Sequence, residues 1–278
     1  LLFSCFGIAN LLWGLKNCHP RDWFYISSLI VIFSAGIRYL TARFWGINWE
    51  YLFDGGVAGQ RLLGTVFQPS TFGVFLILSI FLFLREKRGW SIVCILIATT
   101  FHPTYLFSAG ILTAIYMGIT FWETKDFRLP LALGGAALIG VCPILWHTLN
   151  TFSGDSSTLT TRARQILVEF RIPHHAIVAE WLDASVLVKL SFVGVALIFL
   201  YRYKKQLAVT SEVTVTLPVK LFHIILWPFV ISLSLTFVQA ITNNVVLALL
   251  FPWRLSSWLV PLSVSLVAAG GVHWLFEH

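Results

Sequence analysis

Between Trp90 and Trp122 the chain carries no charged residue, and this run limits what the sequence can fold into. Hydrophobic residues make up 58% of the chain, charged residues only 11%, and the mean hydropathy is +0.83. A water-soluble domain cannot hide so large an apolar share from water. Backbone amides in hydrocarbon must be paired within their own segment, and the apolar runs lack barrel-like alternation. We therefore expect an all-α, polytopic transmembrane helical bundle.

A helix needs about 20 apolar residues to cross the bilayer core, and shorter helices are tolerated inside a bundle. By this measure the sequence predicts nine membrane segments in a single integral membrane domain, residues 1–278. Because an apolar run is already under way at Leu1, where methionine would be usual, we expect a fragment. The predicted segments are Leu1–Leu15, Trp23–Leu40, Phe67–Leu84, Trp90–Phe101, Thr104–Trp122, Leu129–Leu149, Trp181–Tyr201, Val219–Ile241 and Ser257–Phe276.

The charge-free run is predicted to be a helical hairpin, because His102 and Pro103 interrupt it. Proline removes a backbone donor and restricts the residue before it, which disfavours one continuous helix. Lysine and arginine gather in cytoplasmic loops. With a hairpin the inner connections hold eleven basic residues and the outer ones six, whereas a single kinked helix breaks this bias. The charge distribution favours the hairpin.

Net charge and cysteine content exclude two other classes of protein. The charge of +7 comes mostly from the short inner connections, where membrane topology already explains it, so we expect no nucleic-acid partner. The four cysteines are scattered without paired spacing, which indicates neither a zinc site nor disulfides. Chemistry is instead expected in three outer loops, residues 41–66, 150–180 and 242–256.

The first outer loop holds the best candidates for a general base. Asp54 precedes two glycines, and Glu50 lies four residues earlier, where it would share a helical face. A carboxylate at a membrane edge loses solvation, so its pKa rises toward the working pH and it can remove a proton from a hydroxyl. The alternative is that both acids merely hydrate an amphipathic segment. Arg61, in the same loop, is a candidate ligand for phosphate.

The second outer loop combines Arg164 and Arg171 with the adjacent His174 and His175. The planar guanidinium binds phosphate oxygens with two hydrogen bonds, which suits the phosphate of a lipid-linked substrate. The alternative is that the arginines pair with acidic residues of the same loop. Adjacent histidines usually point in different directions, so they predict no self-contained metal site and leave the use of a divalent cation open.

The third outer connection and the apex of the hairpin add Arg254, which follows Pro252, and His102. We expect Arg254 to bind the same anion, although an arginine near a helix end also snorkels to headgroups. His102 is a candidate for orienting a substrate, although a histidine there also hydrogen-bonds its own turn. Lys189 lies inside a predicted span, where an ionisable residue is expensive and normally faces a partner or a cavity.

Four short motifs resemble landmarks of an uncharacterised family of bacterial polytopic membrane proteins that is similar to GT-C glycosyltransferases. The resemblance spans roughly residues 50–265. It implies a GT-C-like fold in the bacterial inner (plasma) membrane, with the active face periplasmic or extracellular. The motifs are Phe67-Gln68-Pro69-Ser70-Thr71-Phe72, Phe101-His102-Pro103-Thr104-Tyr105, Arg171-Ile172-Pro173-His174-His175 and Phe251-Pro252-Trp253-Arg254.

GT-C enzymes, as the resemblance implies, take a sugar from a polyprenyl-phosphate carrier and pass it to an acceptor at the outer face of the membrane. They generally use an acidic residue of the first outer loop as a base or metal ligand. This chain departs from that pattern at its start, where a truncation would remove the family's first outer loop and its acid. Glu50 and Asp54 are then the acidic residues that remain for that role. The expected partners are membrane lipid and the lipid-linked donor.

The residues and the resemblance lead to one hypothesis for the reaction. An acceptor hydroxyl attacks the anomeric carbon and expels polyprenyl phosphate, whose growing charge is stabilised by arginines already in place. The main alternative is a multi-pass transporter or lipid flippase, which predicts polar groups near the bilayer midplane, and there only Lys189 fits. A noncatalytic scaffold is a third possibility. The expected roles are base for Asp54 or Glu50, phosphate binding for Arg171, Arg254, Arg61 and Arg164, and orientation or proton transfer for His102, His174 and His175.

Overall fold

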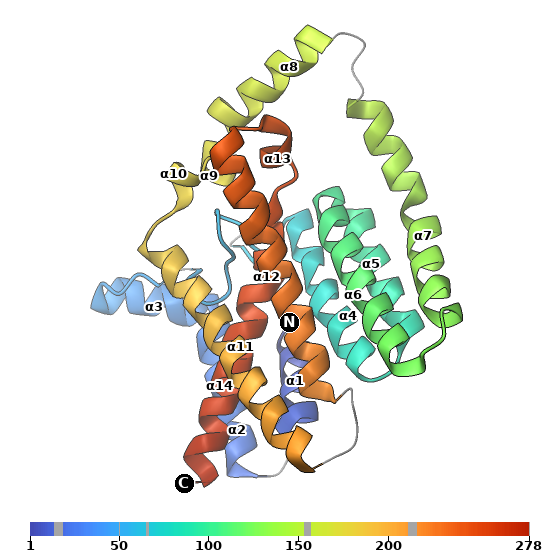
Figure 1. Cartoon of the computed structure of the whole chain (residues 1–278). Helices are drawn as coiled ribbons and strands as arrows, with labels where there is room; N and C mark the ends of the chain where they lie inside the picture. Colours follow the sequence, from blue (N-terminus) through green and yellow to red (C-terminus); the bar gives the residue numbers. More distant parts are fainter. Residues whose placement is uncertain (14–18, 50, 65–66, 153–156, 211–215, 278) are drawn as a thin grey trace.

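The computed structural model describes residues 1–13, 19–49, 51–64, 67–152, 157–210 and 216–277, and the regular elements within these ranges are helices (Figure 1). Five helices in these ranges are long and apolar enough to cross a membrane. The prediction of an all-α chain with several membrane-length helices is therefore confirmed. The five are Pro103–Thr124, Arg128–Thr151, Ala184–Tyr203, Leu217–Thr242 and Val245–Phe276.

Short helical turns separate the longer helices, and most of them lie in the predicted outer loops. The order is α1 (Leu2–Trp13), α2 (Pro20–Phe33), α3 (Ala35–Trp45), η1 (Pro69–Gly73), α4 (Val74–Leu84), α5 (Arg88–Phe101), η2 (Pro103–Tyr105), α6 (Leu106–Thr124), α7 (Arg128–Phe152), α8 (Ser157–Ile166), η3 (Leu167–Arg171), α9 (Pro173–Ala176), α10 (Val178–Trp181), α11 (Ala184–Thr210), α12 (Leu217–Thr242), α13 (Val245–Leu249), η4 (Pro252–Leu255) and α14 (Ser256–Glu277).

The other four predicted segments are apolar helices that fall short of a full span. Leu2–Trp13, Pro69–Leu84 and Arg88–Phe101 are shorter than a bilayer crossing requires. The predicted segment Trp23–Leu40 is broken into α2 and α3, whose axes differ by 67°. The prediction of nine membrane segments is therefore not confirmed: five of the described helices are long and apolar enough to span a membrane, or six if the bent pair is one span.

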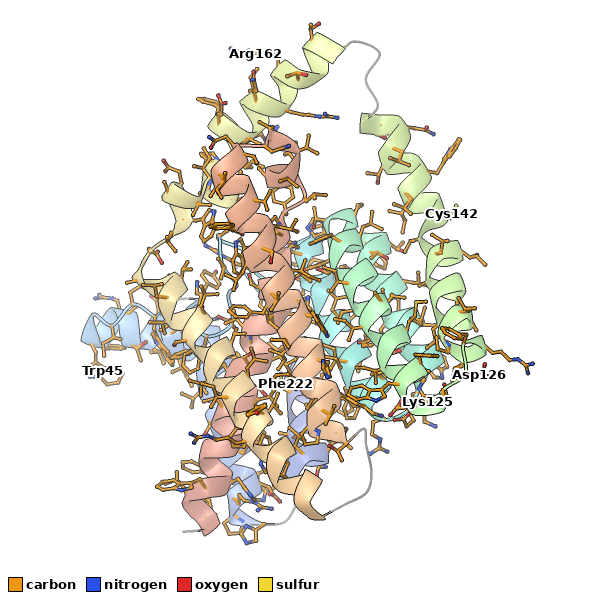
Figure 2. All side chains as sticks on the ribbon, viewed as in Figure 1. Trp45, Lys125, Asp126, Cys142, Arg162 and Phe222 are labelled. Atoms are coloured by element: carbon orange, nitrogen blue, oxygen red, sulfur yellow. The ribbon has the colours of Figure 1, made fainter. Side chains whose placement is uncertain are left out.

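Ser34 explains the break between α2 and α3. Its backbone is extended, and its hydroxyl accepts a hydrogen bond from the amide of Ile37 at 3.3 Å, so it begins a new helix. Helix α3 then projects from the side of the bundle and ends at the exposed Trp45 (Figures 1 and 2). The predicted first outer loop, residues 41–66, therefore begins with the last turn of a helix.

The predicted hairpin is confirmed. Helix α5 ends at His102, whose backbone is extended, and Pro103 opens the next element. Arg88, at the start of α5, forms an ion pair with Glu123, at the end of α6, at 2.8 Å. The two helices can make this contact only if they run in opposite directions.

A four-residue ion network closes the end of the bundle opposite His102. Arg88 pairs with Glu86 at 2.5 Å, and Lys220 pairs with Glu123 at 2.5 Å and also with Glu86. These residues come from three connections that the basic-residue bias placed on one side of the membrane. The network shows that the three connections share one end of the bundle.

Helix α14 is the centre of the bundle, since every residue from Ser256 to Leu266 is buried, including the whole side chain of Trp258. By contrast, most residues of α7 are exposed or half-buried. Helix α7 stands at the edge in Figure 1, and its outward side chains, among them Ile139 and Trp146, are apolar and exposed. Such a surface is stable in lipid but not in water.

We predict that Lys220→Met destabilises the protein by about 1–3 kcal/mol, because it leaves the carboxylates of Glu86 and Glu123 without one of their two cations. The melting temperature of the purified protein in detergent measures this loss. Lys87→Met is the matched control, since Lys87 is an exposed neighbour for which the described residues show no ion pair. Equal melting temperatures of the two variants would contradict the role of the network.

Candidate functional site

The segment Asp54–Gln60, called the buried loop below, lies inside the protein without being helical. Six of its seven residues are buried, and Gly59 is the exposed one. Backbone groups away from water must find partners, and irregular backbone is tolerated at membrane depth only when protein surrounds it. Within the loop, the Gly56 amide donates to the Gln60 carbonyl at 2.6 Å and the Gln60 amide donates to the Val57 carbonyl at 3.2 Å.

Side chains from three distant helices satisfy the other polar groups of the buried loop. The Val57 amide donates to the hydroxyl of Ser256, at the start of α14, at 2.7 Å. Lys189 of α11 donates from Nζ to the Gly56 carbonyl at 3.2 Å, and His175 of α9 contacts the Ala58 carbonyl at 2.5 Å. The loop therefore joins three helices that are remote in sequence.

The contact of His175 with the Ala58 carbonyl favours one tautomer. A carbonyl oxygen only accepts hydrogen bonds, so this short contact favours a proton on Nδ1, although Gln60 Nε2 also lies 3.3 Å from the same nitrogen. Burial lowers the pKa of His175, and its bond to Ala58 partly offsets this effect. His174 lies beside it with ring centroids 4.1 Å apart, contrary to our expectation that the two side chains diverge, but His174 is exposed. His175 is the one that holds the loop.

Two glycines allow the buried loop to pass so close to its neighbours. A Cβ atom at Gly56 would lie 2.7 Å from the backbone nitrogen of Ser257, which is too close for any other residue. Gly59 has φ +64°, a left-handed conformation that other residues rarely adopt, and a Cβ there would also press on the His175 ring. Small residues are thus required by geometry at both positions.

Arg254 is the most unusual charge in the structure, because its side chain is only 8% exposed and two of its nitrogens are unpartnered. Nη1 donates to Gln60 Oε1 of the buried loop at 2.6 Å, and the guanidinium lies over the ring of Tyr105, 4.7 Å from its centroid. Nε and Nη2 are buried without a hydrogen-bond partner in the described part of the chain. Buried donors without acceptors are costly, so these two nitrogens call for an acceptor that the described residues do not supply.

The short helix η4 holds Arg254 in a fixed position. Phe251, just before it, has φ +47°, a strained conformation for an aromatic residue. The hydroxyl of Ser232, on α12, donates to the Pro252 carbonyl at 2.9 Å, and the hydroxyl of Ser257, on α14, donates to the Arg254 carbonyl at 2.8 Å. Hydrogen bonds from α12 and α14 thus hold η4, the turn that carries Arg254, in place.

The hairpin apex reaches the same site. The Tyr105 hydroxyl donates to the Ser70 carbonyl at 2.6 Å, and its ring lies edge-on to that of His102, with centroids 5.4 Å apart. Burial, and then the positive charge of Arg254, lower the pKa of His102 to about 4. His102 is therefore neutral near pH 7 and can accept or donate a hydrogen bond without carrying charge.

Asp54 and Arg38 form an ion pair whose side chains are 0% and 9% exposed. Arg38 is bonded to Oδ1, while Oδ2 is buried without a partner among the described residues. Burial raises the pKa of Asp54, and the pair with Arg38 partly offsets this. Our sequence reading overlooked Arg38, although an ionisable residue inside the predicted segment Trp23–Leu40 is the kind of signal that marks such a partner.

The other predicted residues are exposed or lie outside the described ranges. Arg61 is exposed and stacks on the ring of Tyr51, 3.8 Å from its centroid, and its charge is near enough to help lower the pKa of His175. Arg164 and Arg171 are exposed, and neither forms an ion pair or side-chain hydrogen bond in the ranges that the structure describes. Glu50 lies outside the described residues. The structure thus links His102, His175 and Arg254 through Tyr105 and Gln60. Asp54 lies at the other end of the buried loop, where it pairs with Arg38 and lies near Lys189.

Lys189 is not deep inside a span, as its place in the predicted segment Trp181–Tyr201 suggested. Helix α11 begins only at Ala184, so Lys189 lies in its second turn, where it bonds to the buried loop. Asp183 caps this helix, since its Oδ1 accepts hydrogen bonds from the Val186 amide and the Ser185 hydroxyl, both at 2.8 Å. These two bonds lower the pKa of Asp183. Lys189 thus contacts the buried loop from the second turn of α11.

We predict that Arg38→Met destabilises the protein by about 3–5 kcal/mol, because it leaves the carboxylate of Asp54 buried and uncompensated. The double variant Arg38→Met/Asp54→Asn should recover part of this loss, since no unpaired charge remains. Melting temperatures of the single and double variants in detergent measure both effects. A double variant less stable than Arg38→Met would show that the pair is not the cause.

The lowered pKa of His102 predicts a loss of stability in acid. Between about pH 6.5 and pH 4 the unfolded chain binds a proton at His102 that the folded chain does not, so stability falls as the pH falls through this window. Melting temperatures measured at several pH values should therefore decline less in His102→Asn than in the parent protein. His147→Asn, at an exposed histidine of α7, is the control and should follow the parent curve.

Within the described residues, no three histidine, cysteine, aspartate or glutamate side chains are grouped so that they could hold a metal ion. Comparisons with protein-family models, with curated proteins and with solved structures find no match to this chain. Its function is therefore inferred from the buried loop and from the two unpartnered nitrogens of the Arg254 guanidinium.

Proposed function

We propose that this chain is a membrane glycosyltransferase-like protein that takes a sugar from a polyprenyl-phosphate-linked donor at the outer face of the bacterial inner membrane. The observation that supports it best is the buried guanidinium of Arg254, with Nε and Nη2 free to donate. Two adjacent N–H groups on a planar cation match two oxygens of one phosphate.

The charges around the buried loop favour an anionic ligand. Arg38, Lys189 and Arg254 are three buried cations, and Asp54 is the acid that accompanies them in this part of the site. An excess of positive charge in a low-dielectric interior is costly until an anion compensates it. A phosphate brings the missing negative charge together with acceptors for the free donors of Arg254.

In the proposed reaction, an acceptor hydroxyl oxygen forms a bond to the anomeric carbon of the sugar. The bond from that carbon to the phosphate oxygen breaks, and its electron pair leaves with polyprenyl phosphate. The hydroxyl proton passes to Oδ2 of Asp54, which has no other partner, and the raised pKa of Asp54 favours this transfer. Arg254 stabilises the charge that grows on the leaving phosphate.

The two histidines of the site suit the binding of uncharged hydroxyls. The tautomer favoured at His175 has its lone pair at Nε2, because Nδ1 contacts the Ala58 carbonyl. His102 is neutral near pH 7 and adjoins the ring that supports Arg254. We assign them to orientation of the acceptor or the donor sugar, with Asp54 as the base.

A multi-pass transporter or lipid flippase is the alternative. Pro143 and Pro228 lie inside α7 and α12, and such breaks also occur in transporters. However, Lys189 was the one ionisable residue assigned to the middle of a span, and it lies instead in the second turn of its helix. The polar groups gather at one end of the bundle, which favours chemistry at a surface over passage through the membrane.

We predict that Arg254→Gln lowers the rate of sugar transfer about 100-fold or more, because the leaving phosphate loses its cation. The assay uses the full chain in lipid nanodiscs with a panel of polyprenyl-phosphate-linked sugars, and it measures the release of polyprenyl phosphate. Arg162→Gln is the matched control, since Arg162 is exposed on α8 at the far end of the molecule (Figure 2).

Three results separate the proposal from its alternative. A loss confined to Arg254→Gln, in a variant with the melting temperature of the parent protein, supports sugar transfer at this site. Equal transfer rates in both variants would remove Arg254 from the mechanism. Flux of a lipid-linked sugar across proteoliposomes without any transfer would instead identify a flippase.

A further inference from the structure

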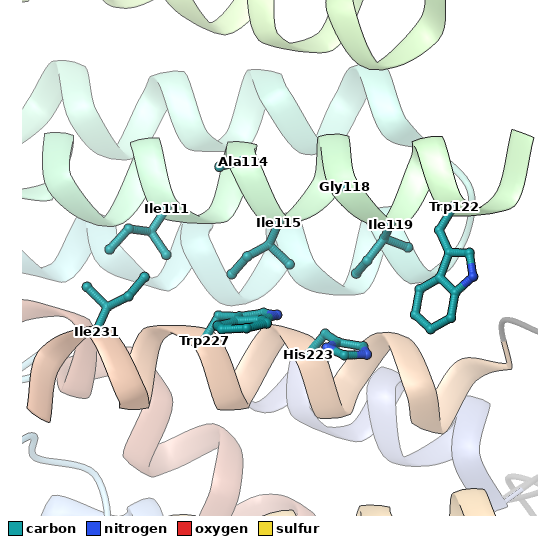
Figure 3. A pocket seen from close by; sticks show the side chains of 9 residues that line it. All are labelled: Ile111, Ala114, Ile115, Gly118, Ile119, Trp122, His223, Trp227 and Ile231. Atoms are coloured by element: carbon teal, nitrogen blue, oxygen red, sulfur yellow. The ribbon is translucent and has the colours of Figure 1, made fainter. Parts of the chain in front are cut away.

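A groove of about 370 Å³ runs between α6 and α12, away from the charged residues of the site. Its walls are apolar side chains of two facing helices (Figure 3). Two small exposed residues, Ala114 and Gly118, lie along α6, and nothing lies within 4 Å of where a Cβ at Gly118 would be. The lining residues are Ile111, Ala114, Ile115, Gly118, Ile119, Trp122, His223, Trp227 and Ile231.

One end of the groove adjoins the anion site. On α6 the groove begins at Ile111, shortly after Tyr105, whose ring lies under Arg254. On α12 it begins at Ile231, next to Ser232, whose hydroxyl donates to the Pro252 carbonyl in the turn that carries Arg254. Both walls thus lead from the buried guanidinium into the apolar part of the bundle.

The other end of the groove is lined by two rings. Trp122 and His223 meet there edge to face, with ring centroids 5.6 Å apart (Figure 3). Glu123, the next residue of α6, belongs to the ion network and pairs with Lys220 at 2.5 Å. From Ile111 to Trp122 the groove therefore has a length of about 16 Å, at 1.5 Å per helical residue.

We infer that this groove binds the first isoprene units of a single polyisoprenyl chain whose phosphate lies at Arg254. The groove is a single channel, which suits a phosphate monoester lipid with one chain better than a phospholipid with two. Because the channel ends at Trp122, chain beyond about 16 Å has to leave sideways into the bilayer. The protein thus recognises only the part of the tail nearest the phosphate. This inference rests on the proposed function.

The inference predicts how affinity depends on the tail. Each additional isoprene unit gains contacts with the groove walls while the groove fills, and gains none once the chain has left the groove for the bilayer. Geranyl phosphate should therefore bind at least 10-fold more weakly than geranylgeranyl phosphate, and undecaprenyl phosphate should bind no more than about 3-fold better than the latter. Dioleoyl phosphatidic acid, with two chains, should compete poorly.

The experiment uses the full chain in nanodiscs and a photoreactive farnesyl phosphate analogue, whose crosslinking the unlabelled lipids displace. Gly118→Leu fills the groove and should weaken the displacement by geranylgeranyl phosphate at least 10-fold. Gly194→Leu is the matched control, because Gly194 lies on α11 with open space around its Cβ position and should behave like the parent protein. Ala114→Leu is a second groove variant, used if Gly118→Leu has a lowered melting temperature.

The outcomes separate the groove from the anion site. Weaker binding in both Arg254→Gln and a groove variant supports the inference. Weaker binding in Arg254→Gln alone overturns the groove while leaving the anion site intact. Weaker binding in the groove variants alone shows a lipid site unrelated to Arg254 and also overturns the inference. Affinity that keeps rising beyond geranylgeranyl phosphate, or equal competition by phosphatidic acid, overturns it as well.

Discussion

The need to satisfy the backbone of the buried loop determines where the helices around it must lie. An irregular segment that is shielded from water keeps its full set of amide and carbonyl groups, and each needs a partner. Ser256, Lys189 and His175 supply those partners from α14, α11 and α9. Since Gly56 brings the loop against the start of α14, the same contacts also bring Gln60 to Arg254. The candidate site is thus a consequence of how the fold pairs its polar backbone.

The two ends of the bundle differ in how completely their charged side chains are paired. At one end the network of Glu86, Arg88, Glu123 and Lys220 matches two acids with two bases, so it is electrically complete. At the other end buried cations outnumber acids, and two nitrogens of Arg254 have no partner among the described residues. A buried charge is tolerated when it is paired, and an unpaired one is costly. The complete network stabilises the fold, whereas the incomplete set is suited to a ligand.

Sequence patterns predicted the helices better than the contacts between them. Long apolar runs and the hairpin at His102 follow from composition and from proline chemistry, which act locally. The break at Ser34 was not predicted, because a serine inside an apolar run does not by itself break a helix. Here Ser34 has an extended backbone and caps the next helix. Arg38 and Gln60 were missed for a similar reason, since each matters through a partner distant in sequence, and a single sequence does not reveal such pairs.

The hairpin break connects the polar site to the apolar groove. Had α5 continued through His102 as one helix, Tyr105 could not turn back to lie under Arg254 and α6 could not run beside α12. The extended backbone at His102 therefore has two consequences. It places the ring of Tyr105 beneath the guanidinium of Arg254, and it sets the direction of α6, whose residues Ala114 and Gly118 line the groove. A ligand with a charged head and a single apolar tail is the kind of molecule that matches both features together.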